Sequence, residues 1–199
     1  PHLIKNLRNN FINKNIKFTL HGKKGEAKWE HLEKMYEKDS ANDIRAVPKW
    51  TDDHFNPPRG KKMKVSLAVQ MFSHTAAAAM KLFVEKGDLP AEALQTAEFL
   101  AEVNRMWDLV NSSSIEAPPG KKAVTAKNLA HYMDLFDAFV DFLSGLSFHR
   151  KPNPKLKRPI NMEKAVVIPS NKGWILALNA LKCLSRELIE EKGLQFICL

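Results

Sequence analysis

Apolar side chains recur three and four positions apart through most of this chain, which is the spacing of one face of an α-helix. Leu3, Leu7 and Phe11 show this spacing in the opening segment. A longer stripe follows in residues 123–146, at Leu129, Tyr132, Met133, Phe136, Phe139, Val140 and Leu143. The pattern predicts a mainly α-helical fold with a few short strands near the two ends.

Turn and cap residues divide this pattern into elements. We expect one long helix over residues 63–86, which Gly87 ends as a C-terminal cap. Asp88 is expected to cap the next helix, with Pro90 in its first turn, where a missing N–H costs nothing. Other helices are predicted over the opening segment, around residues 29–38, and over 123–146 and 172–191, and strands over 16–20, 165–168 and 194–199.

Two polar stretches are predicted to be loops. Residues 46–60 are rich in Pro, Asp and Asn and form a connector that carries Lys49. Residues 149–159 contain three prolines and are predicted to form an exposed basic loop. The basic residues of that loop are Arg150, Lys151, Lys155, Lys157 and Arg158.

The charge of the chain indicates what kind of partner it takes. Its 199 residues carry a formal net charge of +9, which favours nucleic acid, nucleotide phosphates or another polyanion, although many small intracellular domains are simply basic. Cys183 and Cys198 form no metal-ligand motif, so we expect reduced thiols packed as small apolar groups in an intracellular protein. No run of about 18 apolar residues predicts a membrane span. The chain opens on Pro1, which suggests a piece of a longer protein.

Signatures of common enzymes do not occur in the sequence. It contains no phosphate-binding GxxxxGK[ST] or GxGxxG loop, no GxSxG and no HExxH. The seven histidines are scattered without a carboxylate at a telling spacing. Asp134, Asp137 and Asp141 share one helical face, which is more typical of a solvated surface than of a metal site. We therefore predict no catalytic residue and no metal ligand.

One polar and aromatic cluster is consistent with a guanine site. On a helix, Trp107, Asp108 and Asn111 lie at positions that share one face. A carboxylate can accept from the N1–H and exocyclic amine of guanine, an amide can reach its acceptors, and an indole offers a stacking surface. The alternative is that Trp107 is a core residue, Asp108 a surface charge and Asn111 the start of a helix cap.

Three motifs occur in order along the chain: residues 1–6, residues 62–68 with the Phe-Ser-His run at 72–74, and the aromatic-Asp-x-x-Asn-Ser run at 107–112. Together they resemble the P-element-type DNA transposases, the family that includes the transposase-derived THAP-domain proteins of animals. Residues 174–179 fit the same family. The part resembled is a mainly helical, GTP-binding insertion domain that interrupts an RNase H-like catalytic domain.

The resemblance implies that GTP is bound as a cofactor that is not hydrolysed and that helps to hold transposon-end DNA. It implies that Trp107 stacks on guanine, that Asp108 and Asn111 read its edge, and that other residues surround the ribose and phosphates. These are Lys49, Lys64, Val65 and Ser73. Any Mg²⁺ would belong to the full-length catalytic domain, and the full-length protein is expected to be nuclear and to form a homo-oligomer, with no membrane association.

The family pattern also implies domain boundaries, and it places some catalytic and base-holding acids outside residues 1–199. Residues 1–20 would be a flanking RNase H-like segment, residues 21–190 the insertion domain, and residues 191–199 the start of a returning strand. One catalytic aspartate of the family precedes the opening motif, and a catalytic glutamate and a base-holding aspartate follow residue 199. The fragment alone is therefore not expected to cut DNA, and whether it counts as an enzyme stays open.

Two functional readings follow from the sequence. In the first, the domain binds GTP and contacts the DNA backbone through Lys61, Lys62 and the basic residues of 149–159, with a steep dependence on salt. In the second, it is a helical protein-interaction module whose basic surface meets an acidic partner and whose nucleotide site has decayed. Preference for GTP over ATP distinguishes the two.

Overall fold

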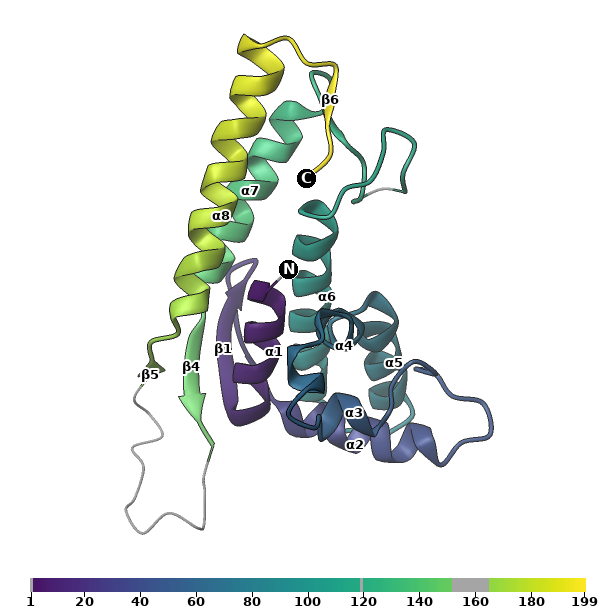
Figure 1. Cartoon of the computed structure of the whole chain (residues 1–199). Helices are drawn as coiled ribbons and strands as arrows, with labels where there is room; N and C mark the ends of the chain where they lie inside the picture. Colours follow the sequence, from purple (N-terminus) through teal and green to yellow (C-terminus); the bar gives the residue numbers. More distant parts are fainter. Residues whose placement is uncertain (1, 119, 152–164) are drawn as a thin grey trace. The chain divides into compact units, whose positions relative to one another are not determined.

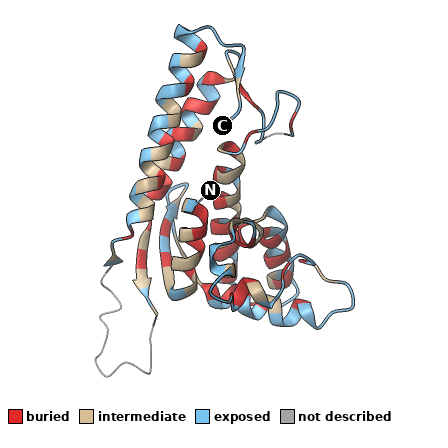
Figure 2. Ribbon diagram, in the orientation of Figure 1, coloured by how far each residue is buried: buried red, intermediate tan, exposed pale blue. Residues whose placement is uncertain are grey.

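A computed structural model describes residues 2–118, 120–151 and 165–199, and the chain divides into two compact units. The first unit comprises Pro1–Asn104 and Gly145–Ile168. The second comprises Arg105–Ser144 and Pro169–Leu199. Each unit buries apolar side chains of its own (Figure 2).

The first unit is built on a helix and a small antiparallel sheet. Helix α1 (His2–Asn13) leads directly into strand β1 (Lys14–Leu20), which forms a hairpin with β2 (Lys23–Ala27). Strands β4 (Ser147–Arg150) and β5 (Ala165–Val166) complete a sheet of order β2-β1-β4-β5. Figure 1 shows α1 alongside β1. Helix α1 also contacts other helices of the unit, so it connects the sheet to them.

The remaining helices of the first unit are short, apart from its last one. They are α2 (Trp29–Ser40), α3 (Asp52–Phe55), the 3₁₀-helix η1 (Lys61–Met63), α4 (Val65–Met71), α5 (His74–Glu85) and α6 (Ala93–Leu109), which begins in this unit. Helix α1 packs against α4 and η1.

Aromatic side chains form the core of the first unit. The ring of Phe11 lies 5.4 Å from that of Trp29 and 5.5 Å from that of Phe99, both in edge-on geometry, and is stacked 6.4 Å from Phe72. These four side chains are at most 1% exposed. Because they come from α1, α2, α6 and the α4–α5 junction, the cluster fixes four separate parts of the unit around one point.

The second unit is a helical pair with a short two-stranded sheet. It contains the last residues of α6, β3 (Val124–Thr125), α7 (Leu129–Ser144), α8 (Pro169–Arg186) with a π-helical end over Glu187–Glu191, and β6 (Phe196–Ile197), which pairs with β3. Helices α7 and α8 lie side by side. Their pairing buries Phe136 and Phe139 of α7 and Trp174 and Leu178 of α8.

The mainly helical architecture predicted from the sequence is confirmed, as are the opening helix, the strand at 16–20 and the cap at Gly87, whose φ is +76°. Three boundaries were wrong. The expected helix over 63–86 is two helices that break at Phe72 and Ser73. Helix α6 begins at Ala93, so Asp88 does not cap it and instead pairs with Lys38 at 3.0 Å. Helix α7 begins at residue 129, after β3.

Two further expectations need correction. The predicted basic loop begins later than residue 149, because His149 and Arg150 belong to strand β4 and pair with β1. Cys183 and Cys198 are free, as expected, but both are exposed rather than packed as small apolar groups. Only Trp174, Leu178 and Ser185 of α8 are buried, so Cys183 lies on the part of this helix that stays at the surface.

One stretch among the described residues, Val65–Glu85, is long and apolar enough to cross a membrane by length and composition alone. Half of its most apolar window is buried inside the protein. A core helix gives the same result, and the helix breaks at Phe72 in the middle of this stretch, so it is weak evidence for a membrane span.

Candidate nucleotide-binding site

The expected phosphate-contacting residues Lys64 and Val65 lie where η1 passes into α4. Lys64 is the residue before the helix, and its backbone N–H donates to the Lys61 carbonyl at 3.0 Å. Its side chain is exposed, and Val65 is the half-buried first residue of α4. The ammonium of Lys64 is therefore available at the surface, on a backbone that η1 holds in place.

Ser73 lies at the break between the two helices that replace the expected long one. It is the N-cap of α5, and its hydroxyl oxygen accepts a hydrogen bond from the Ala76 N–H at 3.2 Å. A hydroxyl has one hydrogen to donate besides its acceptor positions, so Ser73 can still donate to a phosphate oxygen while it caps the helix. Because the chain breaks here, Ser73 begins a second helix and does not continue the one long helix expected over residues 63–86.

Lys49 projects from a loop that buried groups hold on both sides. The carboxylate of Asp39 is buried, accepts from the backbone N–H groups of Ala46 at 2.6 Å and Val47 at 3.1 Å, and pairs with Arg45. The indole of Trp50 donates to the carbonyl of Gln70 in α4 at 3.1 Å. The exposed side chain of Lys49 lies between these anchors, which restrict the loop that carries it.

The same loop is tied to α4 by a buried histidine. Nδ1 of His54 accepts from the backbone N–H of Thr51 at 3.0 Å, and Nε2 lies 2.8 Å from Oε1 of Gln70, so the tautomer with hydrogen on Nε2 satisfies both partners. Burial lowers the pKa of His54 below its ordinary value, although the hydrogen bonds with Gln70 and Thr51 oppose this shift. His54 is therefore held neutral, with its two nitrogens in different roles.

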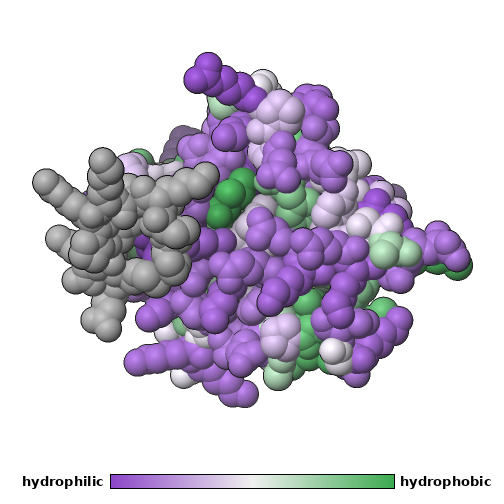
Figure 3. All heavy atoms as spheres, turned by 90° about the horizontal axis from the view of Figure 1, so that it is seen from below, coloured by the Kyte–Doolittle hydropathy of each residue, from purple (hydrophilic) through white to green (hydrophobic). Residues whose placement is uncertain are grey.

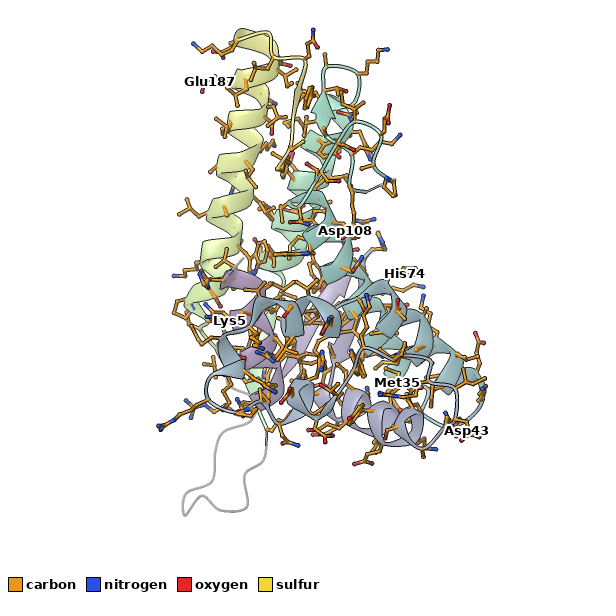
Figure 4. The ribbon with its side chains drawn as sticks, turned by 45° about the vertical axis from the view of Figure 1, so that its right-hand side comes forward. Lys5, Met35, Asp43, His74, Asp108 and Glu187 are labelled. Atoms are coloured by element: carbon orange, nitrogen blue, oxygen red, sulfur yellow. The ribbon has the colours of Figure 1, made fainter. Side chains whose placement is uncertain are left out.

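The expected base-reading residues lie at the end of α6, in the second unit. Trp107 and Asp108 are half-buried in the last turn, and Figure 4 shows Asp108 there. Asn111 was expected on the same helical face, but α6 ends at Leu109 and Asn111 lies in the turn that follows. Its backbone N–H donates to the Asp108 carbonyl at 3.3 Å, so the turn keeps Asn111 close to Asp108.

No sequence pattern predicted a role for Lys121, which forms an ion pair with Asp108 at 3.2 Å. The two side chains are 45% and 21% exposed, so this is a surface pair of modest strength. A contact across twelve intervening residues depends on the path of the loop between α6 and β3, and helical spacing carries no information about it. Lys121 is thus a second charged group next to the predicted base reader.

The expected guanine and phosphate residues fall into two sets. Lys49, Lys64, Val65 and Ser73 belong to the first unit, and Trp107, Asp108 and Asn111 to the second. The assignment of these seven residues to GTP stays a prediction.

The basic residues expected to contact DNA differ in how far they are engaged. Lys61 pairs with Asp53, whereas Lys62 and Arg150 are exposed. Lys151 pairs with Glu30 at 3.8 Å, and burial lowers its pKa although the neighbouring Glu30 opposes this shift. Lys155, Lys157 and Arg158 lie outside the described residues. Over the described ranges, no group of three or more His, Cys, Asp or Glu side chains could hold a metal ion.

Residues 1–124 match the family model described as TNP-like, GTP-binding insertion domain. Because this match covers more than half of the 199 residues, the chain belongs to that family. The matched stretch contains all seven residues that the sequence assigns to GTP. Family membership therefore supports GTP as the ligand of this domain.

Among curated proteins, the chain is similar to the transposable element P transposase of Drosophila melanogaster, with 28% identity over 204 residues. The alignment covers 99% of this chain and 24% of that protein, so the chain spans about a quarter of its length. Among solved structures, the Drosophila P element transposase strand transfer complex matches with a TM-score of 0.76 and 24% identity, over 100% of this chain and 41% of that chain. This second likeness shows the fold, and the predicted resemblance to P-element-type transposases is confirmed.

The neutral state of His54 predicts how stability depends on pH. Because its pKa is lowered in the folded chain, the unfolded chain takes up a proton first as the pH falls below about 6.5. Stability should therefore be complete above about pH 6.5 and decline below it, by at most about 1.4 kcal/mol per pH unit for this one proton.

Urea unfolding between pH 8 and pH 5 measures this effect in the parent chain and in His54→Asn, which keeps an acceptor near the Nδ1 position but does not titrate. Burial also lowers the pKa of His31, so the parent slope contains both groups and the variant should lose only part of it. Identical pH dependence in the two proteins would contradict a neutral, buried His54.

Proposed function

We propose that this domain binds GTP as a cofactor that it does not hydrolyse, and that bound GTP helps to position transposon-end DNA in a longer P-element-like transposase. The observation that carries this proposal is the family match, because it spans residues 1–124 and includes every residue expected around the nucleotide. The longer protein would be nuclear, would act as a homo-oligomer and would supply the catalytic acids. The domain boundaries expected from the sequence, 1–20, 21–190 and 191–199, belong to this proposal.

The first-unit residues suit the sugar and phosphate part of GTP. Lys49 and Lys64 are exposed, and neither forms an ion pair with any described residue. An ammonium that is not already paired can meet a phosphate oxygen with a charge-assisted hydrogen bond. Ser73 adds a hydroxyl hydrogen, and Val65 adds backbone at the start of α4.

The second-unit residues suit guanine. The half-buried indole of Trp107 offers a stacking surface, and the carboxylate of Asp108 can accept from N1–H and the exocyclic amine. The Lys121 ion pair competes with this role, because the ammonium occupies one carboxylate oxygen. The pair lies at the surface and is of modest strength, so we expect guanine to be able to replace Lys121 on the carboxylate. A released Lys121 would then be a further cation near the nucleotide.

The same ion pair is the observation that favours a second candidate function. If Lys121 keeps Asp108, the nucleotide site has decayed and the basic surface serves a protein partner instead. In that case the domain should bind GTP and ATP equally weakly.

Contact with the DNA backbone is supported by charge. The chain carries a net charge of +9. Figure 3, in which acidic and basic residues are both coloured as hydrophilic, shows one face on which hydrophilic residues predominate. Lys62 and Arg150 are exposed in the first unit, whereas Lys61 and Lys151 already have carboxylate partners. We therefore assign the larger part of backbone binding to Lys62 and Arg150 among the described basic residues.

Asp108→Asn tests the assignment of the base reader. The amide offers one donor and one acceptor where guanine needs two acceptors, so GTP affinity should fall by about 1.5–3 kcal/mol, roughly tenfold or more in Kd. Binding of XTP should improve, because xanthine has a carbonyl where guanine has the amine. Calorimetric titration of parent and variant with GTP, XTP and ATP measures both changes.

Asp137→Asn is the matched control, since Asp137 is an exposed carboxylate of the same unit that pairs with Lys182 at 2.6 Å. It should leave the affinity for GTP unchanged. If Asp108→Asn binds GTP as the parent chain does, Asp108 does not read the base.

Salt dependence tests the contact with DNA. Fluorescence anisotropy with duplex DNA at several salt concentrations should give affinities that fall steeply with salt, because each neutralised phosphate releases counterions. Lys62→Gln and Arg150→Gln should each reduce the slope of log K against log salt by about 1, whereas Lys182→Gln, whose ammonium is paired with Asp137, should not change it. A flat dependence on salt in the parent chain would rule out backbone binding by these residues.

A further inference from the structure

Helix α1 presents two buried cations to the short segment that leads into α4. Lys5 is 5% exposed and Arg8 is 0% exposed. The Nη2 atom of Arg8 donates to the carbonyl oxygen of Lys62 at 3.0 Å, and the ammonium of Lys5 lies 3.3 Å from the sulfur of Met63. Lys62 and Met63 directly precede Lys64 and Val65, where the expected phosphate contacts begin. Arg8 therefore holds the backbone of this segment and Lys5 contacts one of its side chains, that of Met63; Figure 4 labels Lys5 on α1.

Lys5 and Arg8 are unusual as buried charges, because neither has a carboxylate partner among the described residues. Buried cations are ordinarily paired with carboxylates, because the loss of hydration is unfavourable for a charged group. Neither Lys5 nor Arg8 forms an ion pair with a described residue, and the Nε and Nη1 atoms of Arg8 have no hydrogen-bond partner there. A thioether is a weak acceptor for the ammonium of Lys5.

A protein with an apolar side chain at position 8 should therefore be at least as stable as the parent chain with Arg8. Replacing a buried ion pair with apolar residues of similar volume is often neutral or stabilising, and the buried charge of Arg8 lacks even the partner that such a pair provides. Burial lowers the pKa of Arg8, yet arginine remains charged in proteins, so the positive charge stays beside η1. Its presence is better explained by a role in binding than by packing.

The segment that Arg8 holds is fixed on its other side as well. The backbone N–H groups of Lys61 and Lys62 both donate to the carbonyl of Pro58, at 2.9 and 3.1 Å, and the ammonium of Lys61 pairs with Asp53. The hydrogen bond from Arg8 therefore selects the orientation of the Lys62 peptide within a turn that is already tight. Only Met63 lies between Lys62 and Lys64, so a change at Arg8 that reorients the Lys62 peptide also shifts Lys64.

We propose that Arg8, with Lys5, is a positioning residue for the phosphates of a bound nucleoside triphosphate. Arg8 holds the Lys62 carbonyl and Lys5 contacts the Met63 side chain, and together they determine the place of Lys64 and Val65. This inference rests on the proposed function, since it concerns the same GTP site. It extends that site to α1, which the sequence did not include. The two buried charges also make the surroundings of the entrance to α4 more favourable for a polyphosphate.

The proposal predicts a loss of affinity that depends on the phosphates. Arg8→Met keeps most of the volume and removes the charge and the hydrogen bond to the Lys62 carbonyl. Calorimetry with GTP and GMP should show Kd for GTP raised about tenfold or more and Kd for GMP changed less than about twofold. Arg8→Lys, which keeps the charge without the planar fork, should recover part of the affinity for GTP.

Stability without nucleotide separates positioning from packing. The urea midpoint of Arg8→Met should equal or exceed that of the parent chain, and Lys5→Met should weaken GTP in the same selective way. Lys38→Met, which removes an exposed cation of the same unit, should leave the ratio of the two affinities unchanged. If Arg8→Met unfolds at lower urea and binds GTP and GMP more weakly in parallel, Arg8 is a packing residue and the proposal is wrong.

Titration of the parent chain distinguishes this failure from failure of the proposed function. A parent chain that binds GTP selectively, with an Arg8→Met variant that binds it equally well, overturns the role of Arg8 alone. A parent chain that shows no preference for GTP over ATP overturns both.

Discussion

The aromatic cluster around Phe11 is the interaction on which the first unit depends. It brings α1, α2, α6 and the junction between α4 and α5 to one point. Phe72 takes part in it at the residue where α4 ends, so the break in the helix and the burial of this ring occur together. Ser73 follows at once as the cap of α5. The position of one of the expected phosphate contacts is thus a consequence of core packing.

The same cluster explains why α1 matters to the site. Phe11 and Arg8 are one helical turn apart, so they lie on the same side of α1. When Phe11 is buried against Phe72, Arg8 is carried into the interior beside η1, where it meets the carbonyl of Lys62. A hydrophobic contact therefore accounts for the burial of a charge that has no carboxylate partner among the described residues. The favourable packing of the aromatic rings offsets the unfavourable desolvation of the Arg8 guanidinium.

Carboxylates determine which of the many cations remain available. Asp53, Glu30 and Asp88 each pair with a lysine of the first unit, namely Lys61, Lys151 and Lys38. Lys49, Lys62 and Lys64 form no ion pair with a described residue and stay exposed. The net charge indicates that the protein binds a polyanion. The structure distinguishes the lysines that are already paired with carboxylates from those that are available to bind a polyanion.

Helical periodicity was sufficient to predict the class of fold, most helices and the strand of the hairpin, because burial of an apolar face has a clear spacing. It could not predict the break at Phe72, since an aromatic residue fits the apolar pattern of a continuous helix as well as it fits a core beyond a helix end. The start of α6 at Ala93 was missed because Asp88 and Pro90 are both typical of a helix start. The residues of the candidate site came from family motifs, whereas Lys121, Lys5 and Arg8 are contacts made in three dimensions.

The central claim is that this domain recognises GTP. Its most direct test is calorimetric titration of the 199-residue chain with GTP and with ATP under the same conditions. The account predicts saturable binding of GTP at one site and binding of ATP that is weaker by at least about tenfold, because adenine presents no pair of donors to Asp108. Equal affinities for the two nucleotides, or no binding of either, would contradict it.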